Sequence, residues 1–61
     1  MPGVSYWWYK AKQNSYGEYM SYFHKGVKYL LFVVEPSELT IRELGLTYVG
    51  KGDINYIKKG E

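Results

Sequence analysis

The chain has 61 residues, a net charge of +2 and no cysteine, which excludes the usual covalent support of so small a fold. A structural zinc site generally needs four Cys or His ligands, whereas His24 is the single histidine. A domain of this size buries only about 60% of the surface of its unfolded chain, so its stability depends on dense packing or self-association. We therefore expect one small domain spanning residues 1–61, without cofactor or metal.

Membrane insertion and secretion are not expected. The longest apolar run, residues 29–34, is far shorter than the roughly 18 residues that cross a bilayer. Residues 1–3 lack the basic and apolar regions of a signal peptide. These features predict a soluble, intracellular (cytoplasmic) protein. The scarcity of Gln and Asn beside abundant Tyr, Lys and Glu favours a heat-adapted source.

Three strands are expected in the first half of the chain. Residues 4–12 and 18–24 are rich in β-branched and aromatic side chains, and residues 13–17 between them have a turn composition. Lys25-Gly26 has the length of a two-residue hairpin loop, which predicts a third strand over residues 27–34. Because this third segment is apolar at nearly every position, we expect it to be central and covered on both faces in its later part.

A short helix is predicted over residues 38–44. Glu35-Pro36-Ser37 ends the third strand, and either Ser37 or Glu35 is placed to cap the first free amides. Gly45 is expected in the left-handed conformation, with Leu46 folding back on Ile41 in a Schellman motif. The alternation of apolar positions within residues 38–44 leaves a strand as the alternative.

The last segments, residues 46–49 and 54–58, have the composition of two short strands around a turn at Gly50-Lys51-Gly52-Asp53. The predicted fold class is therefore α+β, mainly β. A three-stranded antiparallel meander is followed by one short helix and then by a C-terminal hairpin or single strand. A small SH3-like or OB-like β-barrel is the alternative.

The two predicted turns determine which side chains share a face of the sheet. A loop at residues 14–17 places Trp8 opposite Phe23, and the Lys25-Gly26 turn places Phe23 opposite Lys28. The far end of this face is expected to lie under the helix, at Leu30, Phe32 and Val34. The remainder is expected to be exposed and to carry a basic and aromatic patch, namely Tyr6, Trp8, Lys10, Lys12, Tyr19, Phe23 and Lys28.

Ten of the twelve aromatic residues precede position 33, and that half of the chain also carries the net positive charge. A globule this small cannot enclose so many rings, so part of them must face solvent. Exposed rings stack on bases and lysines neutralise phosphates, which favours a non-catalytic DNA- or RNA-binding protein with little sequence specificity. The alternative is a protein-interaction or assembly module, such as a homodimer, that uses the same rings.

The assignment of the first strand to a face is sensitive to the first loop. A change of one residue in that loop exchanges every side chain of the first strand between faces. The rings would then belong to the core, with lysine stems lying over them. This alternative stays open at the level of the sequence.

Catalysis is not expected. His24 has no predicted orienting partner, and Glu38 and Glu43 are five positions apart, so they do not converge on one helix face. Gly50-Lys51-Gly52-Asp53 lacks the spacing of a phosphate-binding loop.

Overall fold

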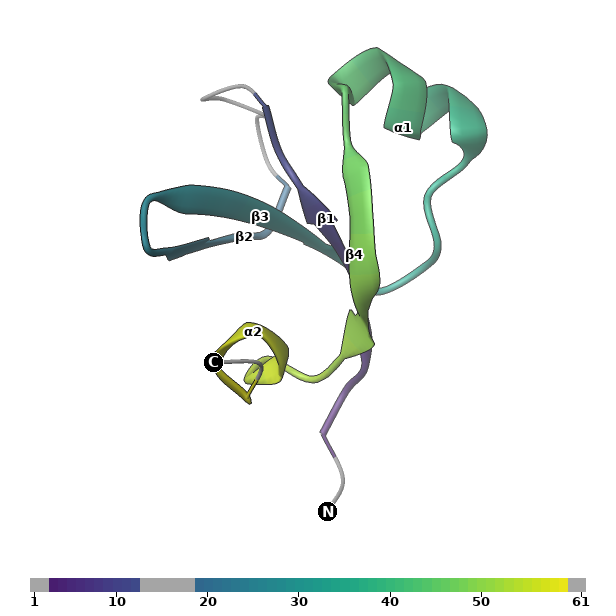
Figure 1. The fold of residues 1–61 in the computed structure, drawn as a ribbon. Coiled ribbons are helices and arrows are strands. Elements are labelled where there is room, and N and C mark those ends of the chain that lie inside the picture. Colours follow the sequence, from purple (N-terminus) through teal and green to yellow (C-terminus); the bar gives the residue numbers. More distant parts are fainter. Residues whose placement is uncertain (1–2, 13–18, 60–61) are drawn as a thin grey trace.

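The computed structural model describes residues 3–12 and 19–59, which form one four-stranded antiparallel sheet and two short helices (Figure 1). The strands lie in the order β2-β3-β1-β4, so β3 and β1 are interior and β2 and β4 are edges. Because the described parts of β2 and β4 do not pair, the sheet is open rather than closed into a barrel. The α+β, mainly β class is confirmed. The elements are β1 (Tyr6–Lys10), β2 (Ser21–His24), β3 (Val27–Phe32), α1 (Glu38–Leu44), β4 (Thr47–Gly52) and α2 (Tyr56–Lys59).

The β2–β3 hairpin forms as predicted. His24 pairs with Val27 and Phe23 pairs with Lys28, around the two-residue turn Lys25-Gly26. Both turn residues have positive φ, 51° and 80°, as a type I′ turn requires, and this turn matches the twist of the strands. The turn therefore sets the register that the sequence indicated.

The predicted meander is wrong, because β1 pairs with β3 and β4 instead of β2. Trp8 lies opposite Leu31 on β3, whereas the sequence placed it opposite Phe23. This pairing moves the side chains of β1 to the opposite faces from those predicted, because neighbouring residues of a strand alternate between faces. The expected turn at residues 13–17 lies outside the described residues.

The helix α1 has the predicted bounds and the predicted ends. The Ser37 side chain accepts a hydrogen bond from the Thr40 amide at 3.2 Å, which caps the first turn. Gly45 has a φ of 66°, and its amide donates to the Arg42 carbonyl while the Leu46 amide donates to the Ile41 carbonyl at 3.0 Å. These two bonds form the Schellman motif, which confirms the helix against the strand alternative.

The C-terminal segment departs from the expectation. The predicted strand at residues 46–49 corresponds to β4, which continues through Gly50 to Gly52 where a turn was expected. Residues 54–58 do not form a strand. Asp53 instead starts α2, because its carboxylate accepts from the Asn55 amide and its carbonyl from the Tyr56 amide, each at 2.9 Å.

Each helix covers part of one face of the sheet, and we call these the α1 side and the α2 side (Figure 1). On the α1 side, Tyr9, Leu30, Phe32 and Leu46 form a buried cluster against which Ile41 and Leu44 of the helix pack. The predicted cover over Leu30 and Phe32 is thereby confirmed, but Val34 is 76% exposed and is not covered.

On the α2 side, Trp8 and Leu31 are buried, and the ring of Tyr56 lies 5.9 Å from that of Trp8. The fold thus has two thin cores, one on each side of the sheet. No helix within residues 3–12 and 19–59 is long and apolar enough to span a bilayer.

Candidate functional site

Trp8, the centre of the predicted patch, belongs to the core. Its relative exposure is 0%, and its indole nitrogen donates a hydrogen bond to the Gly52 carbonyl at 3.1 Å. The rings of Tyr22, Tyr29 and Tyr56 surround it at centroid distances of 5.8, 6.0 and 5.9 Å. The expectation that Trp8 is exposed is therefore wrong. The pairing of β1 with β3 turns this ring away from Phe23 and under α2.

Tyr6, Lys10 and Lys12 are also separated from the predicted patch. Tyr6 and Lys10 share the α2 side with Trp8, where Tyr6 is half-buried and Lys10 is exposed. Lys12 is exposed just beyond β1 and lies close to Gly45 at the end of α1. These three residues do not join the rings of β2.

The remaining three predicted residues lie together on the α1 side, next to the sheet edge. We call Tyr19, Phe23 and Lys28 the β2 patch. Phe23 is 66% exposed, and the ammonium group of Lys28 on the neighbouring strand lies 5.7 Å from the centroid of its ring. Tyr19 is 44% exposed, and its ring lies 5.4 Å from that of Phe32. A lysine at this position over an aromatic face is attracted by the ring quadrupole.

A second lysine–ring pair lies on the α1 side and was not expected from the sequence. Trp7 lies opposite Phe32 on β3 and opposite Lys51 on β4, and the Lys51 ammonium group lies 4.3 Å from the Trp7 ring centroid. Lys51 had been assigned to a turn. In an extended strand, neighbouring residues alternate between faces, so Lys51 faces away from Gly50 and Gly52 on either side of it.

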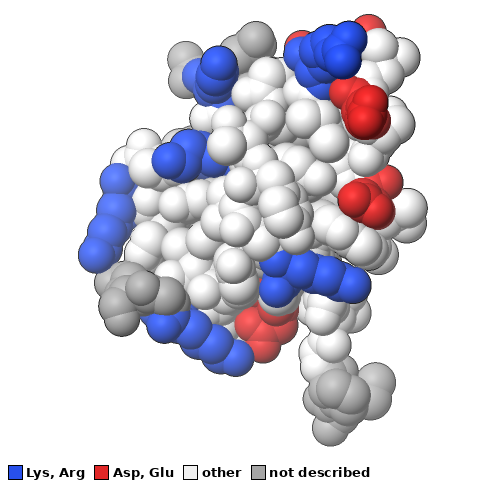
Figure 2. Space-filling model, turned by 45° about the vertical axis from the view of Figure 1, so that its right-hand side comes forward, with Lys and Arg blue, Asp and Glu red and all other residues white. Residues whose placement is uncertain are grey.

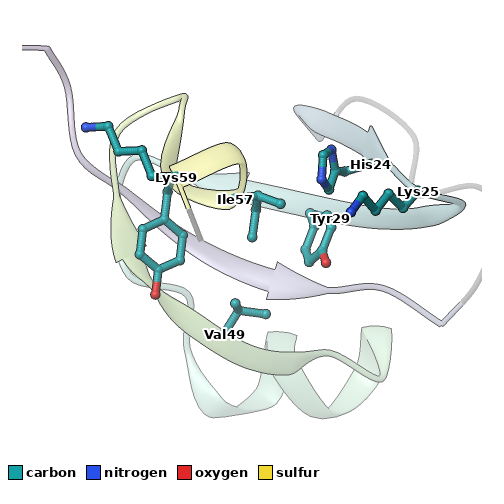
Figure 3. A pocket seen from close by; sticks show the side chains of 7 residues that line it. His24, Lys25, Tyr29, Val49, Ile57 and Lys59 are labelled. Carbon is teal, nitrogen blue, oxygen red and sulfur yellow. The ribbon is translucent and has the colours of Figure 1, made fainter. Parts of the chain in front are cut away.

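An open groove of about 720 Å³ lies on the α2 side, between the β2–β3 hairpin and α2 (Figure 3). The ring of His24 stacks on that of Tyr22, with centroids 6.1 Å apart. Lys59 forms an ion pair with Asp53 at 3.3 Å. The lining residues are His24, Lys25, Tyr29, Val49, Tyr56, Ile57 and Lys59. The sequence does not indicate this groove, because residues 54–58 have the composition of a strand where α2 forms.

On the face seen in Figure 2, charged and uncharged side chains are largely separated. Figure 2 shows a broad uncharged area in the middle of the view, with most Lys and Arg side chains around its margin. Large apolar side chains remain exposed, including Val33, Val34 and Leu39 in and before α1. In the described part of the chain, no three His, Asp or Glu side chains are grouped to hold a metal ion.

The surroundings of Tyr9 in the core under α1 shift the pKa of its hydroxyl. Burial raises the pKa of its hydroxyl above the ordinary value, and the negative charge of Glu35 and the neighbouring Tyr48 raise it further. The neutral hydroxyl is therefore the form that the core under α1 accommodates.

No protein-family model, no curated protein and no solved structure matches this chain.

Proposed function

We propose that this chain is a small, non-catalytic, nucleic-acid-binding protein with little sequence specificity, and that it binds unpaired bases at the β2 patch. The observation that supports this proposal is the exposed ring of Phe23 with the Lys28 ammonium group 5.7 Å from its centroid. A base stacked on this ring would place its phosphate beside a lysine. Base–aromatic stacking is worth about 1–3 kcal/mol per base and tolerates any sequence, because every base has a flat face.

The arrangement suits a single strand of DNA or RNA better than a duplex. Rings on a flat sheet reach bases only where the bases are unpaired. Trp7 on β1 and Lys51 on β4 provide a second lysine–ring pair on the same side, and β3 lies between β1 and β2. Phe23 and Trp7 lie two strand spacings apart, roughly 10 Å, and their partners Lys28 and Phe32 are four positions apart on β3, which adds roughly 13 Å along the strand. The two rings are therefore roughly 16 Å apart, a distance that an oligonucleotide of a few nucleotides spans.

The test is a titration of labelled oligo(dT), oligo(rU) and a DNA duplex with the protein, followed by fluorescence anisotropy at low salt. Both single strands are expected to bind more tightly than the duplex. Phe23→Ala is expected to weaken binding at least tenfold, by loss of the stacked base. Tyr48→Ala is the matched control, because Tyr48 is an exposed ring on the other edge strand. Absence of binding at low salt, or equal effects of both substitutions, would contradict the proposal.

A second candidate function is assembly with another protein, and a different surface favours it. Val33, Val34 and Leu39 are 60%, 76% and 64% exposed. Exposed apolar surface of this kind is typical of a protein contact. Sedimentation of the free protein, compared with Val34→Lys, tests self-association. A monomer at all concentrations would exclude a homodimer through this surface.

A further inference from the structure

We propose that two copies of this chain pair along the outer edge of β2, in antiparallel orientation and centred on Ser21, so that their two sheets join into one continuous sheet. β2 is an edge strand, and no strand within residues 3–12 and 19–59 pairs with its outer side. Such an edge presents a row of backbone amides and carbonyls that pair readily with another strand. The pairing uses this edge and not the α1 side of the sheet, so it does not depend on the proposed function and leaves the β2 patch open.

The backbone groups of Ser21 and Phe23 point outward from the sheet. The Leu31 amide donates to the Met20 carbonyl at 3.0 Å, so Met20 is bonded to β3. Positions in an antiparallel pair alternate between hydrogen-bonded and non-hydrogen-bonded, so Tyr22 is also bonded to β3. Ser21 and Phe23 are the intervening positions, and their amides and carbonyls face away from β3.

The same alternation continues to Tyr19, whose ring lies 5.4 Å from that of Phe32 on the α1 side. A pairing centred on Ser21 places Ser21 opposite the partner's Ser21 and Phe23 opposite the partner's Tyr19. All three outward positions of each copy then face an outward position of the other, which gives about six hydrogen bonds between the two strands. A shift of one residue would set these groups against backbone groups that already bond to β3.

The side chains match in this register on both sides of the sheet. On the α1 side, Phe23 and Tyr19 are largely exposed, and aromatic pairs directly opposite each other stabilise antiparallel strands. On the α2 side, Met20 is 43% exposed and would face the partner's Tyr22. A methionine sulfur packs favourably against an aromatic ring. The second copy thus covers three large side chains that the single chain leaves exposed or half-buried at this edge.

The charges favour a second copy at this edge. A twofold pairing brings each central side chain close to its own copy, which disfavours a charged strand. Residues 19–24 contain no Lys, Arg, Asp or Glu. Lys25 is four positions from the centre, so the two copies of Lys25 lie roughly 27 Å apart along the strands. The two copies of Lys28, on β3, lie roughly 20 Å apart, and both separations exceed the screening length of about 8–10 Å.

The other edge of the sheet is less suited to such pairing. The register between β1 and β4 shifts at Trp8 and Tyr9, which leaves Val49 as an extra residue, and Lys51 adds a charge to the strand. Bulges and lysines are features that prevent edge-to-edge pairing. Figure 1 shows β2 at the far end of the sheet from β4 and α1. β2 has neither feature, so it is the edge at which we place the second copy.

Sedimentation velocity between about 20 µM and about 1 mM is expected to show a reversible, weak monomer–dimer equilibrium, because residues 19–24 are far fewer than the roughly 20–30 residues a side of a standard interface. Amide hydrogen exchange tests the register. The amides of Ser21 and Phe23 are expected to exchange at least twofold more slowly at the highest concentration. The Tyr22 amide, which bonds to β3 in the single chain, is expected to change little.

Ser21→Lys and Ser21→Glu form the decisive pair of variants, because Ser21 lies opposite its own copy. Each variant alone sets like charges against each other and is expected to dimerise at least threefold more weakly than the parent. An equal mixture sets Lys against Glu and is expected to associate at least tenfold more tightly than either variant alone. Thr47→Lys and Thr47→Glu are the matched control, because Thr47 is exposed on the opposite edge strand. Circular dichroism of each variant checks that the fold is kept.

Three outcomes would overturn the proposal: a monomer at every concentration, a mixture of the Ser21 variants that associates no better than either alone, or a dimer that Val34→Lys abolishes and Ser21→Lys retains. The last outcome would place the contact at the apolar surface next to α1. Oligonucleotide binding is a separate readout. A dimer that binds no oligonucleotide would support this proposal and contradict the proposed function, whereas a monomer that binds oligonucleotide would do the reverse.

Discussion

The indole nitrogen of Trp8 donates a hydrogen bond at 3.1 Å to the carbonyl oxygen of Gly52, 44 positions further along the chain. This bond ties β1 to the end of the edge strand β4, at the point where the chain turns toward α2. Trp8 is fully buried, and it contacts rings from β2, β3 and α2. It therefore joins most elements of the fold around one side chain.

Trp8→Phe is expected to destabilise the fold by about 2–3 kcal/mol, because it removes the donor to the Gly52 carbonyl and leaves a cavity. Urea denaturation followed by far-UV circular dichroism measures this loss. Trp7→Phe is the control, since Trp7 is only half-buried on the other side of the sheet. Equal losses for the two substitutions would show that Trp8 is not the centre of the core.

Gly50→Ala is expected to be strongly destabilising, because Tyr56 packs directly on the backbone of β4. An added Cβ at Gly50 would overlap the Tyr56 hydroxyl, and one at Gly52 would lie 2.8 Å from the Tyr56 Cγ. At Gly50 the added methyl meets the far end of the Tyr56 side chain, so the ring must shift off β4 and lose its packing there. Thermal unfolding of the variant measures the cost, which we expect to be about 1–3 kcal/mol.

A double-mutant cycle with Tyr56→Ala tests that cause. With the ring removed, Gly50→Ala should cost much less than in the parent chain, which gives a coupling free energy of at least about 0.5 kcal/mol. Gly3→Ala is the matched methyl addition, since its nearest heavy atom, the Asp53 Cβ, is 3.9 Å away. Strict additivity of the two substitutions would rule out the steric explanation.

The sequence predicted those elements whose signals are local. The Lys25-Gly26 turn fixes the β2–β3 register, and Ser37 and Gly45 fix the ends of α1, because each acts on amides only a few positions away. The β2 patch follows from this register. It is the part of the predicted patch that the structure keeps together.

The position of β1 was not predictable by the same means. Residues 6–9 are four consecutive aromatic side chains, so the period-two pattern does not indicate which side is buried. The pairing is decided by contacts remote in sequence, above all by Tyr56 and Gly52 around Trp8. Gly50 and Gly52 have the composition of a turn, so the sequence predicts one there. In the folded chain the Tyr56 ring packs on both glycines, and this contact, remote from local sequence signals, accounts for glycine within β4.

Lys25→Asn is expected to stabilise the protein by a few tenths of a kcal/mol to about 1 kcal/mol. Lys25 has a φ of 51°, a conformation that costs most side chains free energy but that asparagine tolerates. Asn-Gly is also the preferred pair in a type I′ turn. Thermal unfolding measures the gain, with Lys28→Asn as a control within a strand. A loss of stability in Lys25→Asn would mean that the lysine makes a contact more valuable than the turn strain.

Lys28→Gln and Phe23→Leu are expected to weaken oligonucleotide binding in different ways. For single strands, the logarithm of affinity falls with the logarithm of salt concentration by about 0.7 per neutralised phosphate. Loss of the Lys28 charge should therefore reduce this slope by about 0.7, whereas Phe23→Leu should lower affinity without changing the slope. Anisotropy titrations between 20 and 200 mM salt separate the two effects. An unchanged slope in Lys28→Gln would remove this lysine from the phosphate contacts.

The stability of the protein is expected to fall at alkaline pH more steeply than its exposed tyrosines alone would cause, and Tyr9 is the reason. Burial, with the nearby Glu35 and Tyr48, raises the pKa of Tyr9 in the folded chain above the ordinary value of 10.0. Between these two values the unfolded chain has lost a proton that the folded chain retains, so the free energy of unfolding falls as pH rises. The contribution is complete below pH 10 and is lost as pH passes the folded-state pKa.

Urea denaturation at pH 8 and at pH 11 measures this fall, and Tyr9→Phe identifies its source. The variant keeps the buried ring but has no ionisable hydroxyl, so its stability should fall less between the two pH values than that of the parent. Tyr19→Phe is the control, because it removes a hydroxyl from a partly exposed ring and should retain the pH dependence of the parent. If Tyr9→Phe and the parent lost the same free energy, the ionisation of Tyr9 would not limit alkaline stability, and the α1-side core would have to admit a charged phenolate.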